Sequence, residues 1–176
     1  IFARDFCKKN KIPQPNYFAC SNLHEAKKAV EYFRGNCVVK ADGLASGKGV
    51  IVCDNEKEAF EASKSMLVDK IFSKSGEKIL IEEKLIGLEA SVFAISNGKK
   101  GFLIGTAQDY KRAFDKDKGP NTGGMGAISP APALDNASTK LIKKKIIDKT
   151  IKGMFNLHTP YEGVLYAGIM MTKNGP

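Results

Sequence analysis

The spacing of apolar and polar residues predicts that this chain combines amphipathic helices with short strands. A helical pattern covers residues 1–9. A second helix begins at Asn22, with Glu25 at the capping-box position. Its apolar face consists of Ala26, Ala29, Val30 and Phe33. Asn55 repeats the capping pattern for a third helix that reaches about residue 68.

Apolar and β-branched runs predict strands at residues 79–83, 90–96 and 163–172. The dipeptide Asn97-Gly98 predicts a hairpin that leads into a further strand at residues 102–106. Antiparallel pairs of this kind, mixed with helices, favour an α+β fold over a doubly wound sheet.

The segment from residue 108 to residue 132 is rich in glycine and proline and predicts a long irregular loop. Loops of that length in a compact domain are usually functional or disordered. Asp135 then caps a predicted helix that reaches about residue 157, with apolar positions that repeat at helical spacing and face the core. Asn174 and Gly175 predict a turn after the last strand.

The stretch VVKADGLASGKGVIV, residues 38–52, predicts a phosphate-binding loop between two strands. Its glycines let backbone N–H groups approach a ligand closely, and Lys40 and Lys48 add two positive charges. The Walker A pattern requires a hydroxyl residue and a helix after its lysine, whereas here Gly49 and a strand follow. The alternative is a glycine-rich hairpin whose lysines lie in solvent.

The net charge of +9 is compatible with nucleic-acid binding or with small anionic substrates. The lysines are scattered, and the densest run, residues 143–145, falls within a helical pattern that we interpret as a solvated face. The sequence has no basic–aromatic platform for nucleic acid and no apolar run that could span a bilayer. We therefore expect small-molecule substrates as partners, with no nucleic acid and no membrane, and the oligomeric state stays open.

The cysteines are widely spaced and include no C-x-x-C pair: Cys7, Cys20, Cys37 and Cys53. With two histidines in the chain, this pattern argues against a zinc site. We interpret all four as reduced thiols of a cytoplasmic protein, with Cys37 and Cys53 buried as small apolar residues.

A cluster of carboxylates follows the predicted strand at residues 79–83. Glu82 and Glu83 end the strand, and Glu89 follows a bend that contains Gly87. Free backbone groups at a strand end can bind an adenine edge, and a carboxylate beyond it can accept hydrogen bonds from a ribose. The alternative is a set of ordinary exposed glutamates.

A second cluster combines charges with glycines. Asp109, Lys111 and Arg112 precede the glycine-rich residues 119–126. Lysine and arginine can hold phosphate or carboxylate oxygens, and glycines offer backbone donors to a reacting group. The alternative, a surface loop, explains the glycines but not the charges beside them.

Four segments occur in a specific order: VVKADGLASGKGVIV, ILIEEKLIGLEAS, AQDYKRAFDKDKGPNTGGMGAISPAP and GVLYAGIMMTKNGP. In this order they resemble the glycinamide ribonucleotide synthetases (phosphoribosylamine–glycine ligases) of the ATP-grasp superfamily. The resemblance covers essentially the whole chain and implies an α+β ATP-grasp nucleotide-binding domain of two lobes, with mixed or antiparallel sheets. The nearest alternative is another ATP-grasp carboxylate–amine ligase, and a basic nucleic-acid-binding domain is the alternative from a different class.

The family resemblance also implies a reaction. MgATP is held between two lobes, and its γ-phosphoryl group passes to the carboxylate of glycine. The amine of phosphoribosylamine then attacks the glycyl phosphate, which gives glycinamide ribonucleotide, ADP and phosphate. Such phosphoryl transfer depends mainly on positioning and charge neutralisation.

Site residues carry over from the family one by one. The resemblance implies that Lys40 approaches the phosphate and adenine side of the nucleotide and that Gly47, Lys48 and Gly49 cover its β- and γ-phosphates. It also implies that Glu82, Glu83 and Leu85 line the adenine site and that Glu89 binds the ribose. It implies catalytic and substrate-binding roles for Asp109, Lys111 and Arg112, with further substrate contacts from Asn121, Gly123, Gly124, Met125 and Gly126. Tyr110 stands where the family leads us to expect histidine.

The resemblance further implies a domain arrangement. Residues 1–34 would lead into the ATP-grasp domain, 35–90 would form its small lobe with the flap and hinge, and 91–176 would form part of its large lobe with the substrate loop. The expected cofactors are ATP and Mg²⁺, with a Glu-x-Asn pair of metal ligands expected beyond Pro176. Because the chain also begins at Ile1 and not at methionine, we expect a fragment that is catalytically incompetent by itself.

Overall fold

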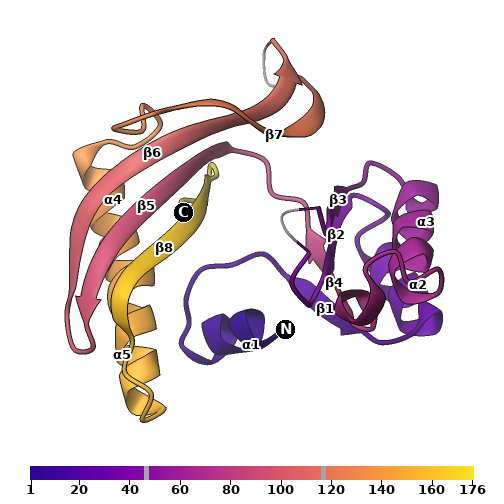
Figure 1. Cartoon of the computed structure of the whole chain (residues 1–176), viewed down its shortest axis with the longest axis horizontal. Coiled ribbons are helices and arrows are strands. Elements are labelled where there is room, and N and C mark those ends of the chain that lie inside the picture. The colour runs from indigo at the N-terminus through magenta and orange to yellow at the C-terminus, as the bar shows by residue number, and fades with distance from the viewer. Residues whose placement is uncertain (46–47, 116–117) are drawn as a thin grey trace. The chain divides into compact units, whose positions relative to one another are not determined.

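The computed structural model describes residues 1–45, 48–115 and 118–176, which form two compact units (Figure 1). Unit 1 contains residues 1–5 and 14–85, and unit 2 contains residues 6–13 and 86–176. Helix α1 (Phe2–Lys9) contributes residues to both. The predicted division into lobes at residues 34 and 90 stays a prediction.

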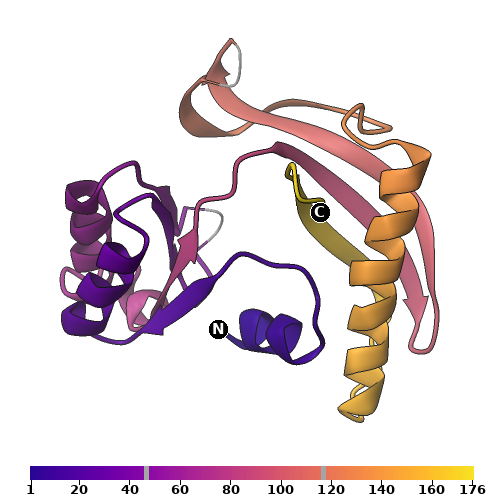
Figure 2. The same cartoon turned by 180° about the vertical axis from the view of Figure 1, so that it is seen from behind.

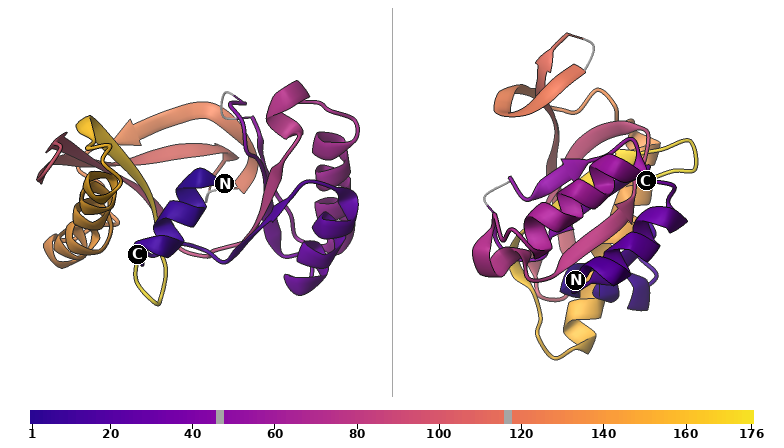
Figure 3. Two further views of the ribbon diagram at one scale, coloured as in Figure 1. Left: turned by 90° about the horizontal axis from the view of Figure 1, so that it is seen from below. Right: turned by 90° about the vertical axis from the view of Figure 1, so that its right-hand side faces the viewer.

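Unit 1 is an antiparallel four-stranded sheet with two helices on one face (Figures 1 and 3). In spatial order its strands are β1 (Tyr17–Cys20), β4 (Ile79–Glu83), β2 (Cys37–Ala41) and β3 (Val50–Val52). The helices are α2 (Leu23–Tyr32) and α3 (Glu56–Leu67), and a short 3-10 helix, η1 (Ser73–Gly76), precedes β4. The helices predicted after Asn22 and Asn55 and the strand predicted at residues 79–83 are therefore confirmed.

The two helices of unit 1 begin with side-chain caps. Asn22 Oδ1 accepts a hydrogen bond from the backbone N–H of Glu25 at 3.0 Å, and Asn55 Oδ1 accepts one from that of Glu58 at 2.9 Å. Each glutamate reaches back to a backbone N–H just before the cap. The capping boxes predicted from the sequence are confirmed.

The two faces of the unit 1 sheet differ in what covers them: α2 and α3 pack on one face only. Val39 and Ile81 are fully buried in the core beneath the helices. Because successive side chains of a strand point to opposite faces, Lys40 and Glu82 lie on the face away from the helices. Cys37 and Cys53 are free thiols buried in the same core, as predicted.

Unit 2 is a second antiparallel four-stranded sheet, and its helical segment crosses one face (Figure 2). In spatial order its strands are β7 (Lys118–Ile128), β6 (Gly101–Phe114), β5 (Leu88–Asn97) and β8 (Glu162–Met171). The helical segment consists of α4 (Asn136–Ile142), the π-helical turn η2 (Lys143–Ile147) and α5 (Asp148–Asn156). Its core contains Val92, Ala94, Ile142, Ile147 and Ile151.

The prediction of a long irregular loop at residues 108–132 is wrong. β6 continues to Phe114, and β7 occupies most of the remainder as its antiparallel partner. The register shifts twice in this ribbon, on either side of Arg112. Glycine has a low intrinsic preference for strands, so that here the pairing with β6, and not local propensity, specifies the strand.

Other predictions for unit 2 are confirmed. Asn97 Oδ1 accepts hydrogen bonds from the backbone N–H groups of Lys99 and Lys100, and Gly98 has a positive φ of 83°, as the predicted hairpin requires. Asp135 caps α4 through the backbone N–H of Ser138 at 2.7 Å. Among the described residues, no helix has the length and apolar character needed to cross a membrane.

Candidate functional site

A buried carboxylate on the face of the unit 1 sheet away from α2 and α3 holds two cations. Glu82 is 2% exposed, and Arg4 of α1 donates to both of its oxygens, from Nε at 2.6 Å and from Nη2 at 2.7 Å. Lys40 Nζ lies 2.7 Å from Glu82 Oε2. The three groups carry a net charge of +1, so that the network presents positive charge on this face.

The environment of Glu82 determines its ionisation. Burial by itself would raise the pKa of this carboxyl, but the hydrogen bonds from Arg4 and the charge of Lys40 outweigh burial and hold the pKa below its ordinary value. The carboxylate therefore stays charged at neutral pH. It can hold the Lys40 ammonium in one place only in that state.

The glycine-rich loop follows β2 in the same unit. Lys48 is exposed and makes no ion pair among the described residues, whereas Gly49 is buried and accepts a hydrogen bond from the backbone N–H of Ala41 at 2.9 Å. Gly47 lies outside the described residues. Lys48 is thus available to an anionic ligand, while the backbone beside it is fixed to β2.

The other predicted nucleotide residues of unit 1 lie at the end of β4. Glu83 Oε2 accepts hydrogen bonds from the backbone N–H and the side-chain amide of Asn16, at 3.3 and 3.0 Å. This carboxylate therefore anchors the segment before β1. Leu85 is half-buried and is the last residue of unit 1.

In unit 2, the charged residues predicted from the sequence lie close together on one face of the sheet. Lys111 Nζ lies 3.4 Å from Glu89 Oε2 and 3.8 Å from Asp109 Oδ2. Strand alternation directs Glu89 away from the helical segment, because its neighbours Ala90 and Val92 are the buried ones. Glu89, Asp109 and Lys111 thus form one cluster on the helix-free face. The cluster joins the residue predicted for the ribose, Glu89, to two residues predicted for the substrate site, and these roles stay predictions.

The charge of Lys111 is stabilised by its neighbours. Partial burial would lower the pKa of this ammonium, but the attraction of Glu89 and, more weakly, of Asp109 outweighs burial and raises the pKa above its ordinary value. Lys111 is therefore cationic throughout the physiological pH range and suits an oxyanion partner better than a role as a general base.

Arg112 has a different environment from Lys111. Its Nη1 donates to the backbone carbonyl of Gly119 at 2.7 Å, across the β6–β7 ribbon. Thr122 Oγ1 donates to the carbonyl of Lys111 at 2.9 Å. These bonds fix the irregular part of the ribbon, so that Arg112 has a structural contact in addition to its predicted role.

The glycines predicted to contact substrate lie in β7. Gly124 and Gly126 have positive φ values of 120° and 154°, and both are exposed with Gly123 and Met125. Asn121 pairs with Arg112 in the ladder, and its side chain lies outside the described part of the chain. The backbone N–H of Gly124 donates to Thr122 Oγ1 at 3.1 Å, and Gly126 pairs with Tyr110 in the ladder. Gly123 and Met125 are exposed and have no ladder partner among the described residues, so that their backbone faces the surface of unit 2.

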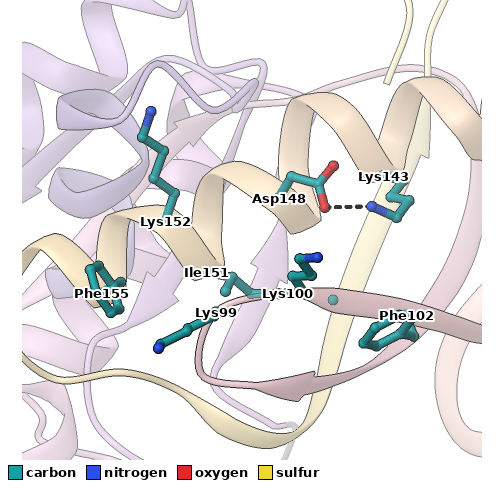
Figure 4. A pocket seen from close by; sticks show the side chains of 9 residues that line it. Lys99, Lys100, Phe102, Lys143, Asp148, Ile151, Lys152 and Phe155 are labelled. Atoms are coloured by element: carbon teal, nitrogen blue, oxygen red, sulfur yellow. Dashed lines mark hydrogen bonds and ion pairs between the residues drawn. The ribbon is translucent and has the colours of Figure 1, made fainter.

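A cavity of about 670 Å³ lies elsewhere in unit 2, between the start of β6 and the helical segment (Figure 4). It is lined by Lys99, Lys100, Gly101, Phe102, Lys143, Asp148, Ile151, Lys152 and Phe155. Lys143 and Asp148 form an ion pair at 2.7 Å, and Figure 4 shows the Lys152 ammonium pointing away from Lys99. None of the predicted site residues lines this cavity, and we assign it no role in the site.

Comparison with known proteins identifies the chain. The family of phosphoribosylglycinamide synthetase ATP-grasp (A) domains matches residues 1–176. The chain belongs to this ATP-grasp domain family. It is 45% identical over 175 residues to a phosphoribosylamine–glycine ligase of Streptococcus pneumoniae, covering 99% of this chain and 42% of that relative.

Two further relatives agree with this assignment. A bifunctional purine biosynthetic protein of Schizosaccharomyces pombe is 43% identical over 176 residues, all of this chain and 22% of that protein. The crystal structure of a phosphoribosylamine–glycine ligase from Thermotoga maritima superposes with a TM-score of 0.90 at 32% identity, over 99% of this chain and 44% of that one. The ATP-grasp domain therefore spans less than half the length of the relatives it matches.

Sequence reasoning about the ATP-grasp domain missed Arg4. This residue is 78 positions from Glu82, and nothing in the local pattern of α1 distinguishes it from the neighbouring lysines. Only the long-range packing of α1 brings it to the carboxylate. The one available signal was the absence of a local partner for Glu82, which must be paired if it is buried.

Proposed function

We propose that the protein containing this chain catalyses the ATP-dependent ligation of glycine to phosphoribosylamine, giving glycinamide ribonucleotide, ADP and phosphate. Family membership supports this proposal, as do the relatives named as phosphoribosylamine–glycine ligases. The single structural observation that carries it is the Lys111 cluster, which places one stabilised cation beside two carboxylates on a helix-free face.

Unit 1 supplies the nucleotide-binding residues in this proposal. Lys48 and the backbone of Gly49 bind the phosphates, and Lys40, held by Glu82, adds a second cation. Charge neutralisation by cations and backbone donors is the main requirement of phosphoryl transfer. Glu83 and Leu85 provide the backbone at the end of β4 for the adenine. Glu89, which belongs to unit 2, provides a carboxylate for the ribose.

Unit 2 supplies the acceptor residues. Lys111 neutralises the glycine carboxylate while the γ-phosphoryl group is transferred to it, and Asp109 binds an amine. The backbone N–H groups of Gly123 and Met125 stabilise the carbonyl oxygen of glycyl phosphate as the phosphoribosylamine nitrogen attacks. The new carbon–nitrogen bond forms as the carbon–oxygen bond to phosphate breaks, and the amine releases a proton.

Magnesium and location complete the proposal. ATP enters such reactions as its Mg²⁺ complex. Among the described residues, no group of three or more His, Cys, Asp and Glu side chains is placed to hold a metal ion. Four free cysteines, three of them buried, fit a reducing compartment, and we assign the reaction to the cytoplasm.

An isotope experiment on the intact polypeptide that carries this chain tests the proposed chemistry. Glycine labelled with ¹⁸O in its carboxylate should transfer one labelled oxygen to inorganic phosphate for each glycinamide ribonucleotide formed. Turnover that leaves the phosphate unlabelled would exclude the glycyl phosphate intermediate.

A further inference from the structure

The 3-10 helix η1 holds the beginning of the glycine-rich loop. The backbone N–H of Gly43 donates to the carbonyl of Ser75 at 3.1 Å, and Ser75 Oγ donates to the carbonyl of Leu44 at 2.8 Å. One residue of η1 therefore satisfies a donor and an acceptor on two successive loop residues. Ser75 is 31 positions from Leu44, so that this contact is tertiary and not a local turn.

These two bonds extend the β2–β4 ladder into the loop. Regular pairing ends at Ala41, opposite Ile79. The backbone N–H of Asp42 then donates to the carbonyl of Lys78 at 3.0 Å, and the Ser75 bonds follow. Three consecutive residues, 42–44, are thus anchored to the body of unit 1 before the loop reaches Lys48.

Side-chain burial cannot supply this anchoring. Leu44 is 91% exposed, so that its side chain contributes almost no packing. Its position depends on the hydrogen bond that its carbonyl accepts from the Ser75 hydroxyl and on the backbone bonds of Asp42 and Gly43 before it. Removal of that hydroxyl should loosen Leu44 and the backbone next to it at the beginning of the loop.

Gly43 fits the same interpretation. A Cβ at this position would lie 2.6 Å from both Cα and Oγ of Ser75, closer than real Cβ contacts allow. The sequence suggested that glycines in this loop admit a ligand. Gly43 instead allows the close approach of Ser75, and a side chain at position 43 would push η1 away from the loop.

We propose that Ser75 is a positioning residue that fixes the first part of the glycine-rich loop and thereby places Lys48 at the nucleotide phosphates. This proposal rests on the nucleotide-binding role proposed above for the loop. Ser75 itself touches no reacting group in this proposal. It acts through the Leu44 carbonyl and the close contact with Gly43.

The test compares Ser75→Ala with Ser73→Ala in the intact polypeptide. Loss of one hydrogen bond that orders the loop should raise KM for ATP about fivefold in Ser75→Ala, with KM for glycine unchanged. Ser73 lies in the same turn, and its hydroxyl has no hydrogen-bond partner among the described residues, so that Ser73→Ala should match the wild type. Unchanged KM for ATP in Ser75→Ala overturns the proposal.

A double-mutant cycle adds a second readout. Gly43→Ala should also raise KM for ATP, and the double variant with Ser75→Ala should show less than the product of the two separate effects, because both changes break one contact. Independent, multiplicative effects would overturn the proposal. Melting temperatures of all variants measure any general loss of stability.

Binding of a non-hydrolysable ATP analogue tests the role of Ser75 separately from the ligase reaction. Weaker binding by Ser75→Ala in a protein without glycine-dependent turnover would keep the role of Ser75 and reject the ligase reaction. Equal binding by the wild type and Ser75→Ala would reject the role of Ser75, whatever the reaction. Absence of nucleotide binding in the wild type would reject both.

Discussion

The ammonium of Lys40 lies 2.7 Å from the carboxylate of Glu82, which is buried on the face of the unit 1 sheet away from α2 and α3. Arg4 binds the same carboxylate through two nitrogens. Lys40 is therefore part of a fixed network in the protein alone. A cation held in this way can meet a phosphate without first losing side-chain freedom, which is the advantage of preorganisation.

This network predicts how stability responds to Glu82→Gln. At pH 7 the substitution should lower the free energy of unfolding by about 2 kcal/mol, because charge-assisted hydrogen bonds to Arg4 and Lys40 are weakened. Urea denaturation measures this difference. Glu31→Gln, which removes an exposed partner of Lys27 at 4.0 Å, is the matched control and should change stability by less than about 0.5 kcal/mol.

The pH dependence of the Glu82→Gln effect follows from the lowered pKa of Glu82. Above the ordinary value of 4.5 the carboxyl is ionised in both folded and unfolded protein, and its full contribution is present. As the pH falls below 4.5 toward the lowered pKa of the folded state, that contribution is lost. The difference in free energy of unfolding between the wild type and Glu82→Gln should therefore shrink in acid. A difference that grows as the pH falls would contradict the network.

Gly35 provides a prediction about backbone geometry. It has a positive φ of 72° after α2, and a Cβ would overlap the backbone nitrogen of Glu56 at the start of α3. Gly35→Ala should therefore lower stability by more than about 2 kcal/mol, measured as a fall in melting temperature. Gly105→Ala is the control, since a Cβ there meets no atom within 4 Å, and equal effects of the two substitutions would contradict this account.

Lys111 provides a prediction about activity. Lys111→Met should reduce kcat/KM for glycine by about 100-fold, because a cation that neutralises the reacting carboxylate is lost. KM for ATP should change little. Lys99→Met removes an exposed lysine of the same unit and should leave turnover unchanged. Steady-state kinetics with each substrate varied separate these effects, and a loss confined to ATP would reassign Lys111 to the nucleotide.

The sequence predicted those parts of the fold whose signals are local. Asn22 and Asn55 predicted two capped helices, and the apolar run at residues 79–83 matches β4. The extent of the β6–β7 ribbon could not be predicted, because its glycines are poor strand formers and its pairing includes two register shifts.

The geometry of the candidate site was less predictable. The sequence singled out Asp109 and Lys111 but placed them in an irregular loop, whereas both lie in β6 and their proximity to Glu89 depends on the pairing of β5 with β6. The contacts of Glu82 with Arg4 and of Leu44 with Ser75 join residues 78 and 31 positions apart. No local pattern encodes such contacts, and only the packed structure reveals them.

The most direct test of the ligase proposal measures ADP release from MgATP by the intact polypeptide that carries this chain. Glycine and phosphoribosylamine are supplied together, and then each is omitted. We predict release that requires both substrates and that falls at least tenfold in Lys48→Ala, while Lys57→Ala on α3 matches the wild type. Release that is independent of phosphoribosylamine, or that needs a different carboxylate and amine, would contradict the proposal.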